Sequence, residues 1–321
     1  MPEESPTTLP KDDAQAKDSP KQETAGLISQ TPVDVASRAV LPARYMLPGV
    51  LFLLTLLTTM LAGAYQEGGK PFDRPADILL GLPFSLALMT ILFVHEMGHY
   101  LTAKRYQVQT TLPYFIPGPW FPFGIGTFGA FIRMRSRVVQ RRALLDIGAA
   151  GPLAGFIAAL VAVGIGLHTA EVVPAQEGGA LILGDPLALS WLAHVMGKET
   201  AAGEQLIINA VGFAGWLGLF LTSVNLLPIG QLDGGHVAYA MLGKKTRILS
   251  RMMVGILIIL GWMGWKGWYV WAFLSIVFGR YHPPIEDESV SFSWQDHVVG
   301  WGTFALLAVT FMPVPFRIHL P

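Results

Sequence analysis

Cysteine is absent from the sequence and charge is scarce. With no cysteine among its 321 residues, the chain cannot hold disulfides, thiolate zinc sites or a cysteine nucleophile. Charged residues make up 14%, well below the roughly 25% of soluble domains. The formal net charge is zero, so composition gives no reason to expect a nucleic-acid partner. Hydrophobic residues make up 52% and the mean hydropathy is +0.48, which predicts a polytopic membrane protein.

The first 44 residues differ from the rest in composition. They are rich in Pro, Thr, Gln, Asp and Lys, and their large apolar residues occur only singly or in pairs. Such a segment buries too little apolar surface to order itself, so residues 1–44 are predicted to be a disordered cytoplasmic tail.

Residues 45–316 are predicted to form a transmembrane domain. The expected fold is all-α, with six or seven transmembrane helices, because the short segment 268–279 fits either a crossing or a re-entrant helix. The link 168–204 is expected to be a polar loop, with a short interfacial helix at 186–196. The expected spans are about 46–64, 78–103, 144–167, 205–226, 247–265, 268–279 and 298–316.

The second of these spans ends in the sequence His95-Glu96-Met97-Gly98-His99. Residues four apart share one face of a helix, so the two histidines can direct ring nitrogens at one metal ion. Glu96 lies beside them and can take a proton from water that the metal activates. Three polar groups at the end of an uncharged run are costly in lipid, which favours a functional site. The alternative is a helix end whose polar residues already lie among lipid headgroups.

A third metal ligand is expected on the same side of the membrane. Asp146, Asp233 and His236 remain as candidates, because no Glu occurs between Glu96 and Glu171, which is predicted on the opposite face. Asp233 is favoured, since a proline and three glycines between positions 228 and 235 break the helix there. Irregular polar backbone at membrane depth usually lines a site. The alternative for Asp233 is a helix N-cap.

Residues 107–142 are unsuited to a membrane-spanning helix. Four prolines between positions 113 and 122 remove main-chain donors and clash with a preceding helical turn. Apolar and basic residues then alternate up to position 135, which predicts a small membrane-associated β-hairpin near the metal site, with a strand at about 125–134. Its glycines would let another backbone approach, so a binding edge is expected; a loop packed as a plug is the alternative. The residues of this candidate edge are Gly126, Phe128, Gly129, Ala130 and Ile132.

Basic residues predict the orientation. The link 104–142 carries seven Lys and Arg and no acid, and the link 227–251 carries four, whereas 168–204 carries one Lys and five acids. The positive-inside rule places the first two links in the cytoplasm, together with the tail. The metal site is therefore expected toward the cytoplasmic side.

Three motifs in this order resemble the site-2 protease family of intramembrane zinc metalloproteases. They are the motif at 95–99, Ala150-Gly151-Pro152-Leu153, and Asn225-x-x-Pro228-x-x-x-x-Asp233-Gly234. The resemblance covers about 78–242 and is greatest to the branch with plant plastid and cyanobacterial members. A PDZ module is not expected, because no link is long enough to hold one.

The resemblance implies one Zn²⁺ per chain, bound by His95, His99 and Asp233. It also implies that Glu96 activates water, that Asn225 binds substrate or the developing oxyanion, and that a re-entrant β-loop occupies about 123–135. Residues 45–316 would then be a transmembrane metalloprotease domain.

The implied reaction is regulated intramembrane proteolysis. The enzyme would hydrolyse peptide bonds within or near the transmembrane segments of single-span proteins, in a bacterial cytoplasmic membrane. Its expected partners are such substrates and the lipid bilayer, and the sequence specifies no oligomeric state. Two alternatives remain: a membrane metallopeptidase that cuts extramembrane segments, and a transporter, because broken helices with polar residues at depth also occur in carriers.

Overall fold

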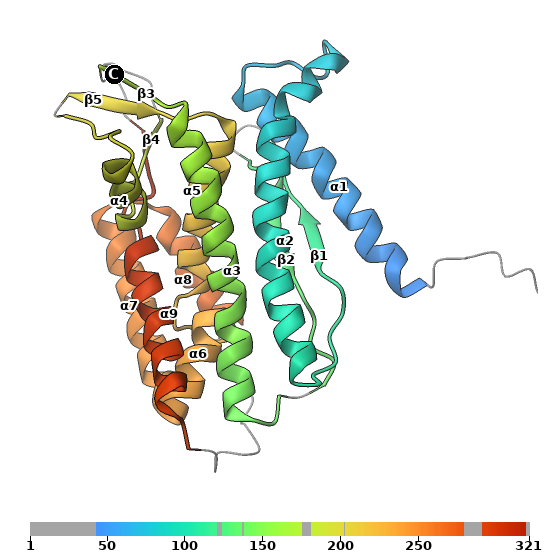
Figure 1. Cartoon of the computed structure of the whole chain (residues 1–321), viewed down its shortest axis with the longest axis vertical. Helices are drawn as coiled ribbons and strands as arrows, with labels where there is room; N and C mark the ends of the chain where they lie inside the picture. Colours follow the sequence, from blue (N-terminus) through green and yellow to red (C-terminus); the bar gives the residue numbers. More distant parts are fainter. Residues whose placement is uncertain are drawn as a thin grey trace, which may run out of the picture. The chain divides into compact units, whose positions relative to one another are not determined.

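A computed structural model describes residues 43–120, 124–136, 138–174, 181–201, 203–278 and 291–318 (Figure 1). The tail expected at 1–44 lies outside the described residues except for its last two, which begin the first helix. The helices are α1 (Ala43–Gln66), η1 (Pro75–Gly81), α2 (Leu82–Arg105), α3 (Arg141–His168), α4 (Leu187–Val195), α5 (Ala210–Asn225), α6 (Asp233–Leu242), η2 (Gly243–Lys245), α7 (Thr246–Met263), α8 (Gly267–Phe278) and α9 (Trp294–Thr310). The strands are β1 (Tyr114–Pro117), β2 (Thr127–Phe131), β3 (Glu171–Pro174), β4 (Leu181–Leu183), β5 (Glu204–Ile207) and β6 (Phe316–Ile318).

The described chain is mostly helical, as the composition predicts. Four helical segments are long and apolar enough to cross a membrane: Tyr45–Gln66, Pro75–Arg105, Arg141–His168 and Asp233–Met263. Helices α5 and α8 are apolar but shorter. Each of the seven expected spans coincides with a helix, namely α1, α2, α3, α5, α7, α8 and α9.

The fourth expected span begins later than the sequence suggests. Its first residues form β5, which pairs antiparallel with β3, and α5 starts only at Ala210. The Asn209 side chain caps that helix by accepting a hydrogen bond from the Gly212 N–H at 2.9 Å. The apolar run therefore divides between a strand and a helix.

Small sheets also occupy the link that was expected to be a polar loop. Besides β3–β5, strand β4 pairs with β6, which follows α9. These strands have three or four residues, so they carry no readable alternation. Strand β3 pairs with the far end of the same link, and β4 pairs with a strand that follows α9. A short helix is present where one was expected at 186–196, namely α4.

The predicted hairpin is present, but its first strand comes from the proline-rich stretch. Strands β1 and β2 pair antiparallel, with Phe115 opposite Ala130, and the register shifts between Ile116 and Pro117. Figure 1 shows the hairpin beside α2, with β1 on the side of α1, and both helices contact it. Helices α1 and α2 therefore cover part of this apolar, non-helical backbone.

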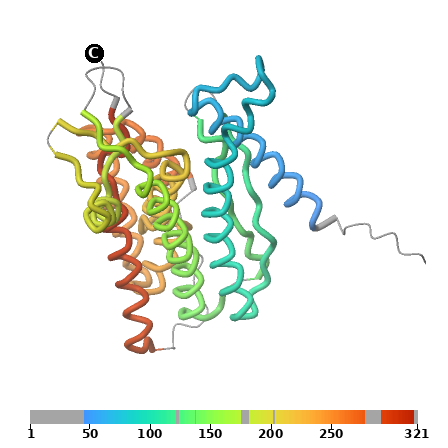
Figure 2. The backbone as a smooth tube through the Cα atoms, turned by 45° about the horizontal axis from the view of Figure 1, so that its top comes forward, coloured from blue at the N-terminus to red at the C-terminus, as the bar shows by residue number. Residues whose placement is uncertain are grey.

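Helix α3 is central to the packing around the site. It contacts α2, α5, α6 and α9, and Figures 1 and 2 both show it between α2 and α9. Glycines allow these approaches: a Cβ at Gly98 of α2 would lie 2.5 Å from the Ala150 oxygen. Small residues let helix backbones approach closely, and this fixes how α2 lies against α3.

Candidate metal centre

Helix α2 carries the first three residues of the site. It is continuous from Leu82 to Arg105, so His95 and His99 lie one turn apart on the same face. The exposed fractions of His95, Glu96 and His99 are 7%, 5% and 6%. The motif is therefore buried inside the protein, and the alternative of a helix end among lipid headgroups does not describe it.

Asp233 meets the two histidines from the start of α6. One carboxylate oxygen lies 3.2 Å from His95 Nε2 and the other 3.3 Å from His99 Nε2. The two Nε2 atoms are 3.1 Å apart. Asp233 is the first residue of α6, and Leu232 occupies the N-cap position. Asp233 is therefore not the N-cap of this helix.

A tightly folded loop brings Asp233 to this position. Helix α5 ends at Asn225, and the chain turns back so that a Cβ at Gly234 would overlap the main chain of Leu226. A Cβ at Gly235 would likewise overlap the Gly230 carbonyl. Only glycine allows this approach of α6 to the preceding loop.

Two glycines of α3 make room for the imidazole rings. A Cβ at Gly151 would overlap the His99 ring, and one at Gly155 would lie 2.9 Å from His95 Nδ1. The immediate neighbours of these two glycines are therefore the site histidines. The signal in the sequence was the motif Ala150-Gly151-Pro152-Leu153, and its contact with the rings was missed.

The hydrogen bond of His99 determines which ring nitrogen faces the site. His99 Nδ1 lies 2.7 Å from the Ile147 carbonyl oxygen, which can only accept, so Nδ1 carries the proton. In the neutral ring, Nε2 then presents a lone pair toward the Asp233 carboxylate. A lone pair facing a carboxylate is stabilised by a cation placed between them, a proton or a metal ion, and this donor set fits a metal ion.

The other two candidate ligands have different surroundings. Asp146 accepts a hydrogen bond from the Tyr106 hydroxyl, which joins the end of α2 to α3. Burial and this carboxylate raise the pKa of Tyr106 to about 12, so its hydroxyl remains a donor at physiological pH. His236 lies with its Cβ against Gly148. Among the described residues, His95, His99 and Asp233 are the group whose ligand atoms converge, all within 4.8 Å.

Two imidazole nitrogens and a carboxylate form the ligand set of many catalytic zinc sites. Such a site has three protein ligands and leaves a fourth position for water or substrate. These three side chains would hold the Zn²⁺, and Glu96 would lie next to it without serving as a ligand.

The predicted edge residues have different environments. Gly126, with φ +80°, lies against α1, where a Cβ would be 2.5 Å from Thr59 Cα. Its lack of a side chain is therefore explained by packing. Gly129, with φ +103°, has open space around it, and Phe128 is 73% exposed. Ala130 lies in β2 opposite Phe115, and Ile132 directly follows the end of β2.

Residues 83–262 match the model of peptidase family M50. The chain belongs to peptidase family M50. This is the family of site-2 proteases, as the motifs predict, and the site residues of α2, α3, α5 and α6 all lie inside the matched region.

The chain is also similar to curated plant proteins. It is 33% identical over 204 residues to the probable zinc metalloprotease EGY2, chloroplastic, of Arabidopsis thaliana, an alignment covering 62% of this chain and 35% of the relative. For EGY1 of Oryza sativa subsp. japonica, the identity is 30% over 231 residues, which covers 63% of this chain and 38% of the relative. For EGY1 of Arabidopsis thaliana, the identity is 26% over 297 residues, which covers 84% of this chain and 53% of the relative. The chain thus spans about a third to a half of these relatives.

Proposed function

We propose that the chain is a zinc-dependent endopeptidase that hydrolyses peptide bonds within or near the transmembrane segments of single-span membrane proteins. The observation that carries this proposal is the convergence of His95, His99 and Asp233, with Glu96 adjacent and buried among apolar helices. Membership of peptidase family M50 and the similarity to probable zinc metalloproteases support it.

The site residues would have separate roles in peptide hydrolysis. Bound zinc supplies a Lewis acid that polarises the scissile carbonyl and makes water more acidic. Glu96 takes the proton of the attacking water and later delivers it to the leaving amine. Asn225, at the half-buried end of α5, would donate to the carbonyl oxygen as negative charge develops there.

Substrate would bind along β2. A helical substrate hides its carbonyls in its own hydrogen bonds, so it must be unwound before it is cut. Among the described strands, β2 pairs only with β1, so its other edge has no strand partner. A substrate segment that pairs with this edge through Ala130, beside the open space at Gly129, would replace the lost hydrogen bonds. The packed-plug alternative applies to Gly126, whose contacts are with α1.

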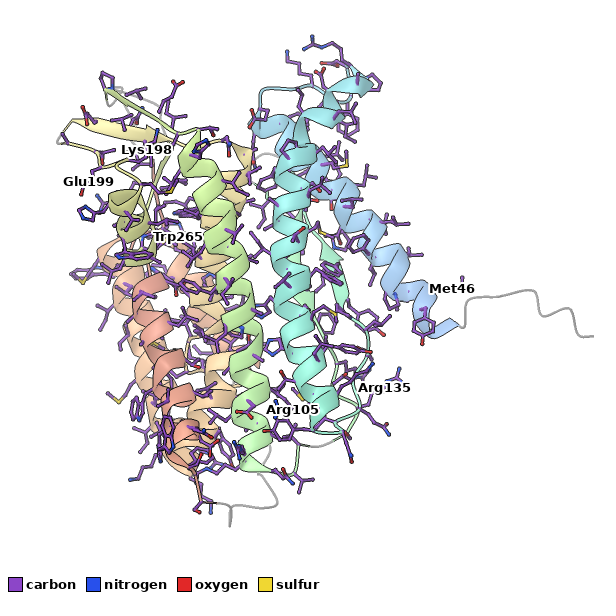
Figure 3. The ribbon with its side chains drawn as sticks, viewed as in Figure 1. Met46, Arg105, Arg135, Lys198, Glu199 and Trp265 are labelled. Atoms are coloured by element: carbon purple, nitrogen blue, oxygen red, sulfur yellow. The ribbon has the colours of Figure 1, made fainter. Side chains whose placement is uncertain are left out.

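The protein would cross the membrane six or seven times, with the active site toward the cytoplasm. Figure 3 places Arg105 and Arg135 at one end of the helices and Lys198 and Glu199 at the other. The first end carries the basic links and the second the acidic one, as the positive-inside rule requires. By this proposal residues 1–44 are a cytoplasmic tail and the membrane is a bacterial cytoplasmic membrane.

The position of the cut tests the proposal directly. Purified protein in liposomes would be given a single-span model protein, and the products would be mapped by mass spectrometry, with Glu96→Gln as control. A Glu96-dependent cut within the apolar span supports the proposal. A cut confined to extramembrane residues would favour a membrane metallopeptidase acting on exposed segments. If none of several such substrates gives a Glu96-dependent product, the assignment as an endopeptidase is overturned. That result would favour the alternative of a transporter.

A further inference from the structure

We propose that Arg141 is a positioning residue for the zinc ligand Asp233: it fastens the last turn of α6 to α3 and so holds the first residue of α6, Asp233, against the two histidines. The inference rests on the proposed function, since it takes Asp233 as a zinc ligand. Arg141 is the first residue of α3 and is half-buried. From the sequence it counts only as one of the seven basic residues of the link 104–142.

The guanidinium group of Arg141 binds the last turn of α6. Its Nη2 donates to the Met241 carbonyl oxygen at 3.0 Å, and its Nε donates to the Ala240 carbonyl oxygen. The last four carbonyl groups of an α-helix have no partner within the helix, so they are available to an outside donor. The positive charge also lies at the negative end of the helix dipole. The guanidinium carbon is 4.3 Å from the centre of the Phe292 ring, so packing holds this side chain as well.

The first turn of α6 is also packed on α3. A Cβ at Gly148 would lie 3.0 Å from His236 Cβ and 3.2 Å from the Asp233 carbonyl oxygen. Arg141 and Gly148 are seven residues apart in α3, which is about two helical turns, so they lie on one face of the helix. Helix α6 is therefore attached to the same face of α3 at both of its ends, with Asp233 at one end and Met241 at the other.

Helix α3 also orients a second ligand of the same metal site. The ring of His99 is held by the hydrogen bond between its Nδ1 and the Ile147 carbonyl oxygen, at 2.7 Å. The position of α6 along α3 therefore decides how far the Asp233 carboxylate lies from the His99 ring. Metal–ligand distances in proteins vary by only about 0.2 Å, so a small shift of α6 would be felt at the metal.

Helix α6 depends on such contacts because it is short and has a glycine turn at each end. It has ten residues, and Gly230 before it and Gly243 after it have φ values of +52° and +56°. Glycine backbone is the most permissive, so these turns add little stiffness of their own. Met241 lies eight residues beyond Asp233, or about 12 Å along the helix. Loss of the Arg141 contacts frees that end, and a tilt of the helix then displaces Asp233.

The chain offers a matched control at the neighbouring residue. Arg142 Nε lies 2.9 Å from the Asp296 carboxylate, in the first turn of α9, and α9 supplies none of the three ligands. Arg141→Met and Arg142→Met therefore make the same chemical change at adjacent positions, but only the first detaches α6. Asp296 keeps its capping box with Ser293 in Arg142→Met, so the start of α9 remains capped.

The experiment measures metal binding by the purified protein without any substrate. Metal-free protein is titrated with Co²⁺, whose visible absorption spectrum depends on the geometry of its ligands, and Zn²⁺ affinity is measured by competition with a chromophoric chelator. We expect Arg141→Met to lower Zn²⁺ affinity by about tenfold and to change the Co²⁺ spectrum, because groups that orient metal ligands contribute on this scale. Arg142→Met should keep the affinity and spectrum of the wild type, whatever its melting temperature.

A purely structural role of Arg141 would give a different result. Arg141→Met would then have a lower melting temperature, but the folded protein would keep the wild-type Co²⁺ spectrum, and the inference would be overturned. Equal losses of Zn²⁺ affinity in the two methionine variants would overturn it as well. If Arg141→Met does not fold, Arg141→Lys takes its place, because lysine keeps the charge but replaces the planar fork by a single nitrogen. A wild-type spectrum and affinity in Arg141→Lys would then refute the positioning role.

Asp233→Ala separates this inference from the proposed function. If Arg141 acts through Asp233, Arg141→Met should change the Co²⁺ spectrum of the wild type but have little further effect in Asp233→Ala. An equal effect in both backgrounds would overturn the inference and leave Asp233 as a ligand. A wild-type spectrum in Asp233→Ala would instead remove Asp233 from the site on which both proposals rest. Metal binding as expected without any cleavage of substrate would contradict the proposed function alone.

Discussion

Gly151 lies directly against the imidazole of His99, so closely that a single methyl group on Gly151 would overlap the ring. The two residues come from different helices, α3 and α2. The ring is held on its other side by the bond from Nδ1 to the Ile147 oxygen, also in α3. One helix thus supplies both the space for a metal ligand and the acceptor that orients it.

Gly151→Ala should therefore weaken zinc binding. The added methyl must displace His99, and we expect a loss of roughly tenfold or more in affinity, comparable to the loss of a residue that orients a ligand. Zinc affinity by competition with a chromophoric chelator measures this. Gly255→Ala in α7 is the control, because a Cβ there meets nothing within 4 Å. Equal affinities in the two variants would contradict the steric argument.

Asp233→Ala should lower zinc occupancy, because it removes one of three ligands. Asp146→Ala is the comparison, since its partner is the Tyr106 hydroxyl and its loss should leave zinc bound. Zinc per chain, measured by inductively coupled plasma mass spectrometry, separates the two variants. Full occupancy in purified Asp233→Ala would remove Asp233 from the ligand set.

Glu96→Gln should keep its zinc and lose most of its turnover. The amide cannot accept the proton of the attacking water, and general-base catalysis contributes typically 10²–10⁴-fold. The measurement pairs zinc content with the initial rate on a single-span substrate. A rate within a few-fold of wild type would show that another group moves the proton.

Gly126→Ala should destabilise the hairpin through its contact with α1. A Cβ would press on the Thr58–Thr59 backbone, and overpacking of this kind costs about 1–3 kcal/mol. Gly68→Ala is the matched control, because Gly68 has a similar positive φ of 75° but open space around it. Backbone strain is thus common to both variants, and the difference between their melting temperatures reports the contact. Equal shifts in the two melting temperatures would mean that backbone strain alone explains the effect of Gly126→Ala.

The sequence alone was sufficient for the local features. The spacing of His95 and His99 predicts a shared helix face, and α2 is continuous through both. The seven apolar segments predict the helices, and the prolines before position 122 correctly exclude a helix there. These features depend on neighbouring residues, where a fixed period of 3.6 residues or a missing N–H acts directly.

The predicted start of the fourth span was wrong, and the sheets of the link 168–204 were not predicted. Both errors have a physical reason. A strand of three or four residues is stabilised by its partner, and β3 and β4 find theirs in distant segments. The same apolar residues fit a helix or a strand until the partner is known. Local composition therefore favoured a longer helix and a loop.

The relations within the site required the tertiary structure. Sequence reasoning left Asp146, Asp233 and His236 as possible third ligands, and the folded chain brings the Asp233 carboxylate to both histidines. It also places Gly151 against the imidazole of His99. Contacts of this kind depend on how helices and strands far apart in the chain pack together. The sequence determined which groups were available, and packing between distant segments decided which of them meet.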